Sequence, residues 1–294
     1  MDTQKKNKIR WAGVVFLSST AFLGFVLAPL YLWRFGVSVF ELGLFFIYAF
    51  ATMMAITVGY HRLYAHASFR AHPLVDFFIL FFGAAAFEQS ALRWASLHRT
   101  HHKHVDTELD PYSIKKGFFH AHMGWIIFGK PQTQDNVADL RKNPLIAAQH
   151  DHYQKWALFA GLILPLALGA ATGHLLGALL LVVAARIAIV HHGTFFINSF
   201  AHYFGTSDYD PDSSAKDNWL GAVLTNGEGY HNFHHRFPSD YRNGIRWHHW
   251  DPTKWMIWCL SKVGLASDLN RTPSEKIAEA KANTLAIKAA AART

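Results

Sequence analysis

Gly229-Tyr-His-Asn-Phe-His-His235 carries three histidines, at positions 231, 234 and 235. On an α-helix the offsets i, i+3 and i+4 share one face, so the three rings are expected to point the same way. His98-Arg-Thr-His-His102 repeats this spacing, and His61-Arg-Leu-Tyr-Ala-His66 places two histidines five residues apart. Each box lies just past an apolar segment. Together the three boxes predict a multi-histidine metal centre at a membrane surface, because imidazole suits iron, zinc, copper and nickel.

The composition is that of a membrane protein rich in histidine. Of 294 residues, 51% are hydrophobic, 16% are charged and 20 are histidine, whereas an ordinary soluble domain has about 25% charged residues. The net charge is +8, but the charges are not gathered on one face beside stacking aromatics, so no nucleic-acid partner is expected. Positive charge beside membrane segments more often sets topology or meets anionic lipid headgroups. The single cysteine, Cys259, excludes an internal disulfide and a thiolate cluster.

Four apolar runs are long enough to cross about 30 Å of hydrocarbon. Short turns join the first run to the second and the third to the fourth, which predicts two hairpins. The basic segment before the first run contains Lys5, Lys6, Lys8 and Arg10 and places both termini in the cytoplasm. A cleaved signal peptide is the alternative for the first run, but that run is long for this role and a second span follows at once. The expected spans cover residues 11–33, 40–60, 156–173 and 175–197.

Residues 73–92 look like a further span, but a crossing there would place the boxes at 61–66 and 98–102 on opposite faces of the membrane. We therefore expect a helix that lies in or near the cytoplasmic interface. Segments 93–154 and 198–294 are then cytoplasmic. The predicted fold is a single all-α integral-membrane domain over residues 1–294, with four transmembrane helices in two hairpins and a cytoplasmic helical cap that holds the histidine-rich site.

The number of histidines favours two metal ions. The three boxes supply eight, and His202, just past the fourth span, is a ninth candidate. His61 and His66 lie about 140° apart on an ideal helix, so we expect them at a helix end and its exit. His191 and His192 are interpreted as packing residues or hydrogen-bonding partners of the site. Arg186 lies near mid-membrane, where a charge is costly, and a structural or a catalytic role would fit.

The motifs HRLYAH (61–66), HRTHH (98–102), NSFAH (198–202) and GEGYHNFHH (227–235) together resemble membrane fatty-acid desaturases of the stearoyl-CoA delta-9 type. The likeness runs from about residue 40 to 265, and includes Arg93-Trp94, Asp110-Pro111, Gly117-Phe118-Phe119, His122, Gly124-Trp125, Phe237-Pro238 and Asp240-Tyr241. It implies a di-iron centre with nine histidine ligands, an asparagine that reaches iron through water, and no catalytic residue separate from the metal site. By position the asparagine is Asn198, and the ligands are His61, His66, His98, His101, His102, His202, His231, His234 and His235.

The resemblance implies O2-dependent removal of two hydrogens from a saturated acyl chain, giving a cis double bond, with acyl-CoA as the expected substrate and delta-9 as the expected position. Zinc has no redox chemistry and cannot do this, although it can replace iron in recombinant protein because histidine sites accept both metals. The sequence has no CxxCH, cysteine cluster or GxGxxG. We therefore expect a separate electron donor, a ferredoxin, rubredoxin or cytochrome b5-like protein with its reductase. Lys115 and Lys116 are candidates for contact with an acidic donor or a substrate headgroup, and solvated surface charge is the alternative.

Several alternatives remain at this level. A fatty-acyl or alkane hydroxylase would use the same iron scaffold. A histidine-rich metal transporter would need ligating residues within the spans, which only Arg186 and His191–His192 approach. The acyl chain is expected to enter a narrow apolar tunnel between the spans. Animal acyl-CoA members of the family carry Arg-Asp directly before the second box, in contact with CoA, where this chain has Ser96 and Leu97. Another thioester or a phospholipid therefore stays open as the acyl carrier.

Overall fold

The structure is a computed structural model that describes residues 9–129, 134 and 136–293. The basic segment 1–8, with Lys5, Lys6 and Lys8, lies outside the described residues, so the orientation of the termini stays a prediction. The described chain is mostly helical, in agreement with the predicted class. Its two short strands, β1 (Arg70–Ala71) and β2 (Ala266–Ser267), pair antiparallel.

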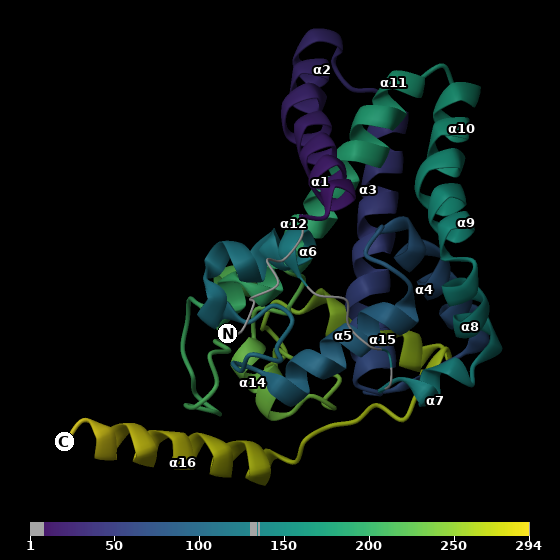
Figure 1. Cartoon of the computed structure of the whole chain (residues 1–294). Coiled ribbons are helices and arrows are strands. Elements are labelled where there is room, and N and C mark those ends of the chain that lie inside the picture. The colour runs from purple at the N-terminus through teal and green to yellow at the C-terminus, as the bar shows by residue number, and fades with distance from the viewer. Residues whose placement is uncertain (1–8, 130–133, 135, 294) are drawn as a thin grey trace, which may run out of the picture.

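Four continuous helices are long and apolar enough to cross a membrane: Trp11–Phe35, Val39–Ala65, Tyr153–Ala171 and Leu175–His202. They run roughly alongside one another and project from one side of the molecule (Figure 1). Several contain π-helical or 3₁₀ turns, which are labelled η. Their parts are α1 (Trp11–Phe22), η1 (Leu23–Leu27) and α2 (Ala28–Phe35); α3 (Val39–Met54) and η2 (Ala55–Ala65); α9 (Tyr153–Leu158), η5 (Phe159–Ile163) and α10 (Leu164–Ala171); α11 (Leu175–Gly177), η6 (Ala178–Ala185), α12 (Arg186–Asn198) and η7 (Phe200–His202).

Local sequence determines the turn of the first hairpin. Gly36 has a φ of 74°, which glycine adopts without strain, and it ends α2. Ser38 then begins α3 with a capping box, in which its hydroxyl accepts a hydrogen bond from the Glu41 backbone at 3.1 Å. The Glu41 carboxylate in turn accepts hydrogen bonds from the Ser38 backbone at 2.8 Å and from the Tyr31 hydroxyl at 2.5 Å. The carboxylate at the start of the second long helix is therefore fully partnered.

The helix Leu175–His202 forms the centre of the bundle. Its most apolar 18-residue window is 72% buried, whereas the corresponding windows of the other three helices are 17–33% buried. η6 packs against η1, α3 and α10. A Cβ atom on Gly24 of η1 would lie 2.9 Å from the Cα of Ala185, so only glycine allows this close approach.

Arg186 is buried inside the bundle and has a structural role. Its guanidinium donates to the carbonyl of Ala85 at 2.6 Å and to that of Gly161 at 3.0 Å, and its Nε donates to Val182 at 2.7 Å. The Gly161 carbonyl lacks a partner within its helix because Pro165, four residues later, has no N–H to donate. Ala85 is the last residue of its helix, where carbonyls also lack intrahelical partners. Arg186 therefore supplies donors to backbone groups that hydrocarbon would leave unsatisfied.

The predicted interfacial helix is shorter than residues 73–92. Helix α4 (Pro73–Ala85) has 13 residues, or about 20 Å, which is less than the roughly 30 Å needed to cross hydrocarbon. It ends early because Phe87 and Gln89 adopt left-handed φ values of 59° and 78°. A new helix, α5 (Ala91–His104), then starts at a Ser90 cap. The position of α4 relative to a bilayer stays a prediction.

The remaining helices form what we call the cap, the helical region at one end of the bundle, where α5, α14 and α15 cross beneath the long helices (Figure 1). Helix α16 (Ser274–Ala291) lies along the outer side of the cap. The cytoplasmic location of the cap and the single-domain description stay predictions. The other elements are η3 (Ile114–Lys116), η4 (His120–Gly124), α6 (Trp125–Phe128), α7 (Ala138–Arg141), α8 (Pro144–Asp151), α13 (Trp219–Leu224), α14 (His231–Arg236) and α15 (Pro252–Lys262).

Replacing Arg186 with methionine is expected to destabilise the bundle, because it leaves the Ala85 and Gly161 carbonyls without donors at a cost of about 1–3 kcal/mol each. We expect the melting temperature in detergent to fall by roughly 5 °C or more. Arg34→Met, which removes an exposed arginine from the end of α2, is the matched control and should melt like the unchanged protein. Equal melting temperatures for both variants would contradict the structural role of Arg186.

Candidate metal centre

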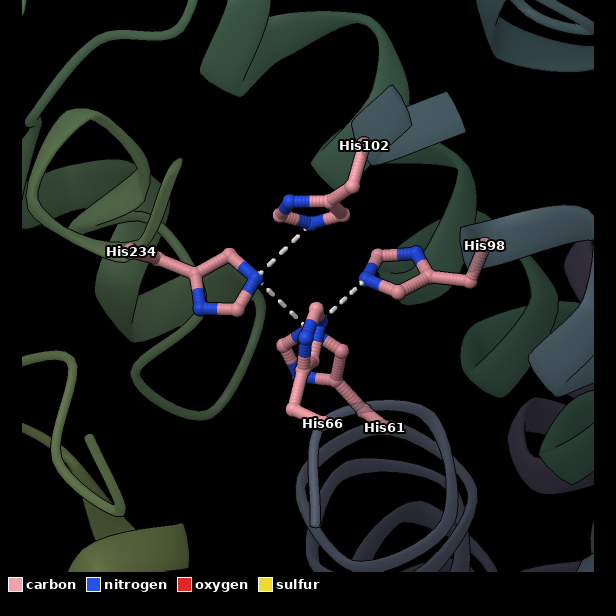
Figure 2. A group of neighbouring side chains, drawn as sticks. All are labelled: His61, His66, His98, His102 and His234. Atoms are coloured by element: carbon pink, nitrogen blue, oxygen red, sulfur yellow. Dashed lines mark hydrogen bonds between the residues drawn. The ribbon is translucent and has the colours of Figure 1, made fainter. Parts of the chain in front are cut away.

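The nine histidines singled out by the sequence come together in two clusters. One ring nitrogen of each histidine lies within 4.8 Å of the corresponding nitrogens of every other member of its cluster. Figure 2 shows the rings of the first cluster converging from three separate chain segments. The first cluster contains His61, His66, His98, His102 and His234, and the second contains His101, His202, His231 and His235.

Each HxxHH box serves both clusters, which differs from the single shared face expected from the spacing. The i and i+4 members stay together, as with His98 and His102 in the first cluster and His231 and His235 in the second. The i+3 member of each box goes to the other cluster. Adjacent helical residues point about 100° apart, so neighbours such as His101 and His102 diverge. The clusters are in contact where the rings of His102 and His235 stack, with their centroids 4.2 Å apart.

A π-helix brings His61 and His66 into one cluster. Both were expected at a helix end and its exit, and His66 is indeed the residue that caps η2. The backbone N–H of His66 bonds the carbonyl of His61 at 3.2 Å, the i→i+5 bond of a π-helix. This wider winding brings His66, five positions after His61, closer to the same face of the helix. The 140° separation calculated for an α-helix therefore does not apply.

Carboxylates fix the orientation of one histidine in each cluster. Glu228 lies 2.9 Å from Nδ1 of His61, and Asp110 lies 2.9 Å from Nδ1 of His101. The Ser214 hydroxyl lies 2.7 Å from Nδ1 of His202. A carboxylate at Nδ1 keeps the proton on that nitrogen, so Nε2 presents a lone pair to the cluster. In the sequence, Glu228 and Asp110 were noted only as parts of motifs. Their closeness to the histidine boxes was the signal that they could orient a histidine ring.

Glu228 is held ionised by its surroundings. It is fully buried, and burial raises its pKa, but Arg62 and His61 outweigh burial and lower the pKa to about 2. Arg62 lies 2.9 Å from the carboxylates of both Glu228 and Asp251. The side-chain amide of Asn243 also donates to Glu228 at 2.6 Å. Because Arg62 follows His61 on η2, this buried network fixes the end of the second long helix to the cap.

Burial keeps six of the clustered histidines neutral: His66, His98, His102, His231, His234 and His235. Burial lowers the pKa of His98, His102 and His234 well below its usual value, and the neighbouring histidines lower it further. Burial also lowers the pKa of His231 to about 3. Neutral imidazole is the form that binds metal. These histidines therefore need to lose no proton when an ion enters.

The donor set fits metal ions. The Nε2 atoms of His61 and His234 are 3.0 Å apart, and those of His231 and His202 are 3.1 Å apart. With Nδ1 of His61 and His101 facing carboxylates, the Nε2 lone pairs of these two rings point into the clusters, where a cation could accept them. Groups of five and four nitrogens match two ions rather than one. Nitrogen ligands alone suit iron and zinc equally.

An apolar cavity of about 340 Å³ adjoins the first cluster. Phe16 and Leu17 of α1 line it together with Leu97 of α5, and His61 and His98 form part of its wall. Its volume is within the range of about 300–1,000 Å³ that is usual for small-molecule sites. This cavity is the candidate location of the acyl-chain tunnel expected between the spans, which stays a prediction. Asn198, the predicted water-mediated contact, also lies in its wall.

Glu88, a buried carboxyl group in the lining of this cavity, is partnered. Glu88 accepts hydrogen bonds from the indole of Trp94 at 3.1 Å and from the hydroxyl of Thr194 at 2.9 Å. Burial raises the pKa of Glu88 to about 8, so its carboxyl group is largely uncharged at pH 7. The Trp94 ring stacks on His98 with centroids 5.1 Å apart. Glu88 thus fixes Trp94 beside His98 in the wall of the cavity.

The other candidates lie away from the clusters. Nε2 of His191 is 2.7 Å from the carbonyl of Ala86, and Nδ1 of His192 is 2.9 Å from Nε2 of His122, so neither belongs to a described cluster. Lys116 is 3.3 Å from the carboxylate of Glu108 and, like Lys115, is absent from the described cavity lining. Contact of these lysines with a donor or headgroup stays a prediction.

Comparison with known proteins agrees with this geometry. The family model described as fatty acid desaturase matches residues 40–260. The chain is 42% identical to a probable acyl-CoA desaturase of Schizosaccharomyces pombe over 76% of its own length and 48% of the relative. It is 38% identical to acyl-CoA desaturase 1 of Saccharomyces cerevisiae over 92% of its length and 54% of the relative. It is 34% identical to an sn-2 palmitoyl-lipid 9-desaturase of a Nostoc species over 91% of its own length and 93% of the relative.

This chain belongs to the fatty acid desaturase family. It spans about half the length of the two yeast relatives. The chain thus combines membership of this family with four helices long and apolar enough to cross a membrane and two histidine clusters that could hold metal ions.

Removing one ligand is expected to empty one cluster and leave the other. We predict that His101→Ala or His234→Ala loses roughly half of the bound metal, because a cluster that lacks one nitrogen holds its ion more weakly. We also predict that either variant loses its enzymatic activity. Metal per chain is measured by mass spectrometry, and helix content by circular dichroism. His104→Ala, on the same helix but outside both clusters, is the control. Full metal content in either cluster variant would remove that histidine from the site.

Asp110→Asn should weaken metal binding without unfolding the cap. Loss of the carboxylate at Nδ1 of His101 is expected to lower affinity about 10–100-fold, as for other ligand-orienting carboxylates. Competition with a chelator measures the change. Asp139→Asn alters a carboxylate that is 60% exposed and paired with Arg99, and it should leave affinity unchanged. Identical chelator curves for both variants would show that Asp110 does not orient a ligand.

Proposed function

We propose that this protein is an O2-dependent fatty acyl desaturase that introduces a cis double bond at delta-9 into a saturated chain, with acyl-CoA as the first candidate substrate. The observation that carries the proposal is the contact between the apolar cavity and the first histidine cluster. Phe16 and Leu17 offer a surface for methylene groups, and His61 and His98 border the same space. An acyl chain in this cavity would lie directly beside the metal centre.

Two iron ions, held by the nine clustered histidines, would supply the oxidising power needed to remove hydrogen from an unactivated C–H bond. The protein's own residues have three tasks. Glu228 and Asp110 fix the ring orientation of His61 and His101. The uncharged Glu88 holds Trp94 against His98 and keeps this part of the wall free of charge. We propose that Asn198, in the same wall, contacts one ion through water.

The electrons would come from another protein. Reduction of O2 to water takes four electrons, and the acyl chain supplies two of them when two hydrogens are removed. The chain has one cysteine and no haem-attachment motif. We therefore propose a ferredoxin, rubredoxin or cytochrome b5-like donor with its reductase. Lys115 and Lys116 remain proposed contacts for an acidic donor or a headgroup.

The proposed setting is a bilayer, with four spans, both termini in the cytoplasm and the cap on the same side. The helix Val39–Ala65 has 27 residues, up to about 40 Å, so it is longer than the roughly 30 Å of hydrocarbon. Its last turns would project beyond the hydrocarbon. Because His61 and His66 lie at this end, the metal centre would sit at the membrane surface.

Product analysis tests the proposal. We expect a desaturase-deficient host that expresses the chain to accumulate cis-9 monounsaturated lipids, and the purified iron-loaded protein with a donor, O2 and stearoyl-CoA to form the oleoyl product. The His234→Ala variant is the inactive control. Protein loaded with zinc should be inactive because zinc has no redox chemistry. A hydroxylated chain as the only product would favour a hydroxylase, and metal transport without lipid oxidation would favour a transporter.

A further inference from the structure

A second cavity adjoins the apolar one. It has a volume of about 350 Å³ and lies between the start of α5 and the junction of α8 with α9. Gln89 and Arg93 line both cavities, so the two spaces meet at these side chains. The second cavity lies beside Tyr153, the first residue of the third long helix. On the proposed topology this is the level of lipid headgroups, where polar and apolar parts of one molecule can be held together.

The two cavities differ in chemistry. The first is lined mainly by apolar side chains, whereas the second is lined by Arg93, Lys155 and two histidines, His150 and His152. Among the residues that the structure describes, neither Arg93 nor Lys155 forms a side-chain hydrogen bond or ion pair. The acidic residue of the lining is Asp151, whose carboxylate lies 3.7 Å from Arg141. The second cavity therefore offers two cationic donors, and the carboxylate in its lining is paired with Arg141 outside it.

The border between the cavities is held in place by the surrounding helices. The backbone N–H of Gln89, which has a φ of 78°, donates to the hydroxyl of Tyr153 at 3.2 Å. The Ser90 hydroxyl lies 2.6 Å from Nδ1 of His150. The N–H of Ala91 donates to the side chain of Gln149 at 3.1 Å. A border fixed at three points needs little ordering when a ligand binds.

We propose that the second cavity binds the phosphate group of the acyl carrier, with Arg93 as its principal contact, while the acyl chain occupies the apolar cavity. Guanidinium is suited to phosphate because it donates several hydrogen bonds from one plane. Lys155 would add a second positive charge. The ligand class is a phosphate ester joined to a long apolar chain, which includes both a nucleotide thioester and a phospholipid. The proposal rests on the proposed function, because it assumes that an acyl chain fills the first cavity.

The test compares carriers with and without phosphate on the iron-loaded full chain in nanodiscs. We expect Arg93→Ala to raise the KM for stearoyl-CoA roughly ten-fold or more, since hydrogen bonds to charged groups are among the stronger ones. The KM for stearoyl-pantetheine, which lacks phosphate, and kcat for both substrates should stay unchanged. Arg93→Lys keeps the charge and should recover part of the loss. Lys142→Ala, which removes an exposed cation beside α8, is the matched control and should leave both KM values unchanged.

A binding measurement separates this proposal from the proposed function. Titration of coenzyme A alone, followed by calorimetry, should show binding to the unchanged protein and at least ten-fold weaker binding to Arg93→Ala, even if no substrate is turned over. If coenzyme A does not bind but turnover of phosphatidylcholine depends on Arg93, the phosphate comes from a phospholipid. Equal effects of Arg93→Ala on stearoyl-CoA and stearoyl-pantetheine, or no effect on any phosphate-bearing compound, would overturn the proposal.

Discussion

Imidazole rings are held inside this protein with their ring nitrogens about 3 Å apart, an arrangement suited to cations between them. Charged histidines would repel one another, and burial prevents this at His98 and His234 by keeping these rings neutral. The geometry persists only because the surrounding structure fixes each ring, so most of the cap can be understood as support for these contacts.

That support comes from elements far apart in the sequence. Arg62 on η2 bridges Glu228 and Asp251, both in the C-terminal part of the cap, and Glu228 in turn contacts His61. Breaking the ion pairs of a buried arginine between two carboxylates strongly destabilises the fold, because removing one partner leaves an uncompensated buried charge. The end of the second long helix and the segment that carries the third histidine box are thus held in a fixed relation. Ring positions in the first cluster depend on it.

The same reasoning applies inside the bundle, where backbone groups take the place of side-chain charges. Pro165 and the end of α4 each leave a carbonyl without a helical partner, and Arg186 bonds both. This fixes α4 against the third and fourth long helices. Since α4 leads through the turn at 86–90 into α5, the bond network also positions the helix that carries His98, His101 and His102. The turn itself borders both cavities at Gln89.

The sequence by itself determined the helical class, the four long apolar helices and the nine histidines that meet in the structure, because apolar run length and histidine spacing are local properties. It did not determine how those histidines divide between two clusters, since the spacing gives a helical face but not which neighbour each ring meets. It also missed the early end of α4 and the roles of Glu228 and Asp110 as partners of histidines, and it left the role of Arg186 open between structure and catalysis. Left-handed backbone at Phe87 and Gln89, π-helical winding at His61 and buried ion pairs all arise from contacts between distant segments. Only the tertiary structure brings those segments together, and only there does burial give their charges and unsatisfied carbonyls a physical consequence.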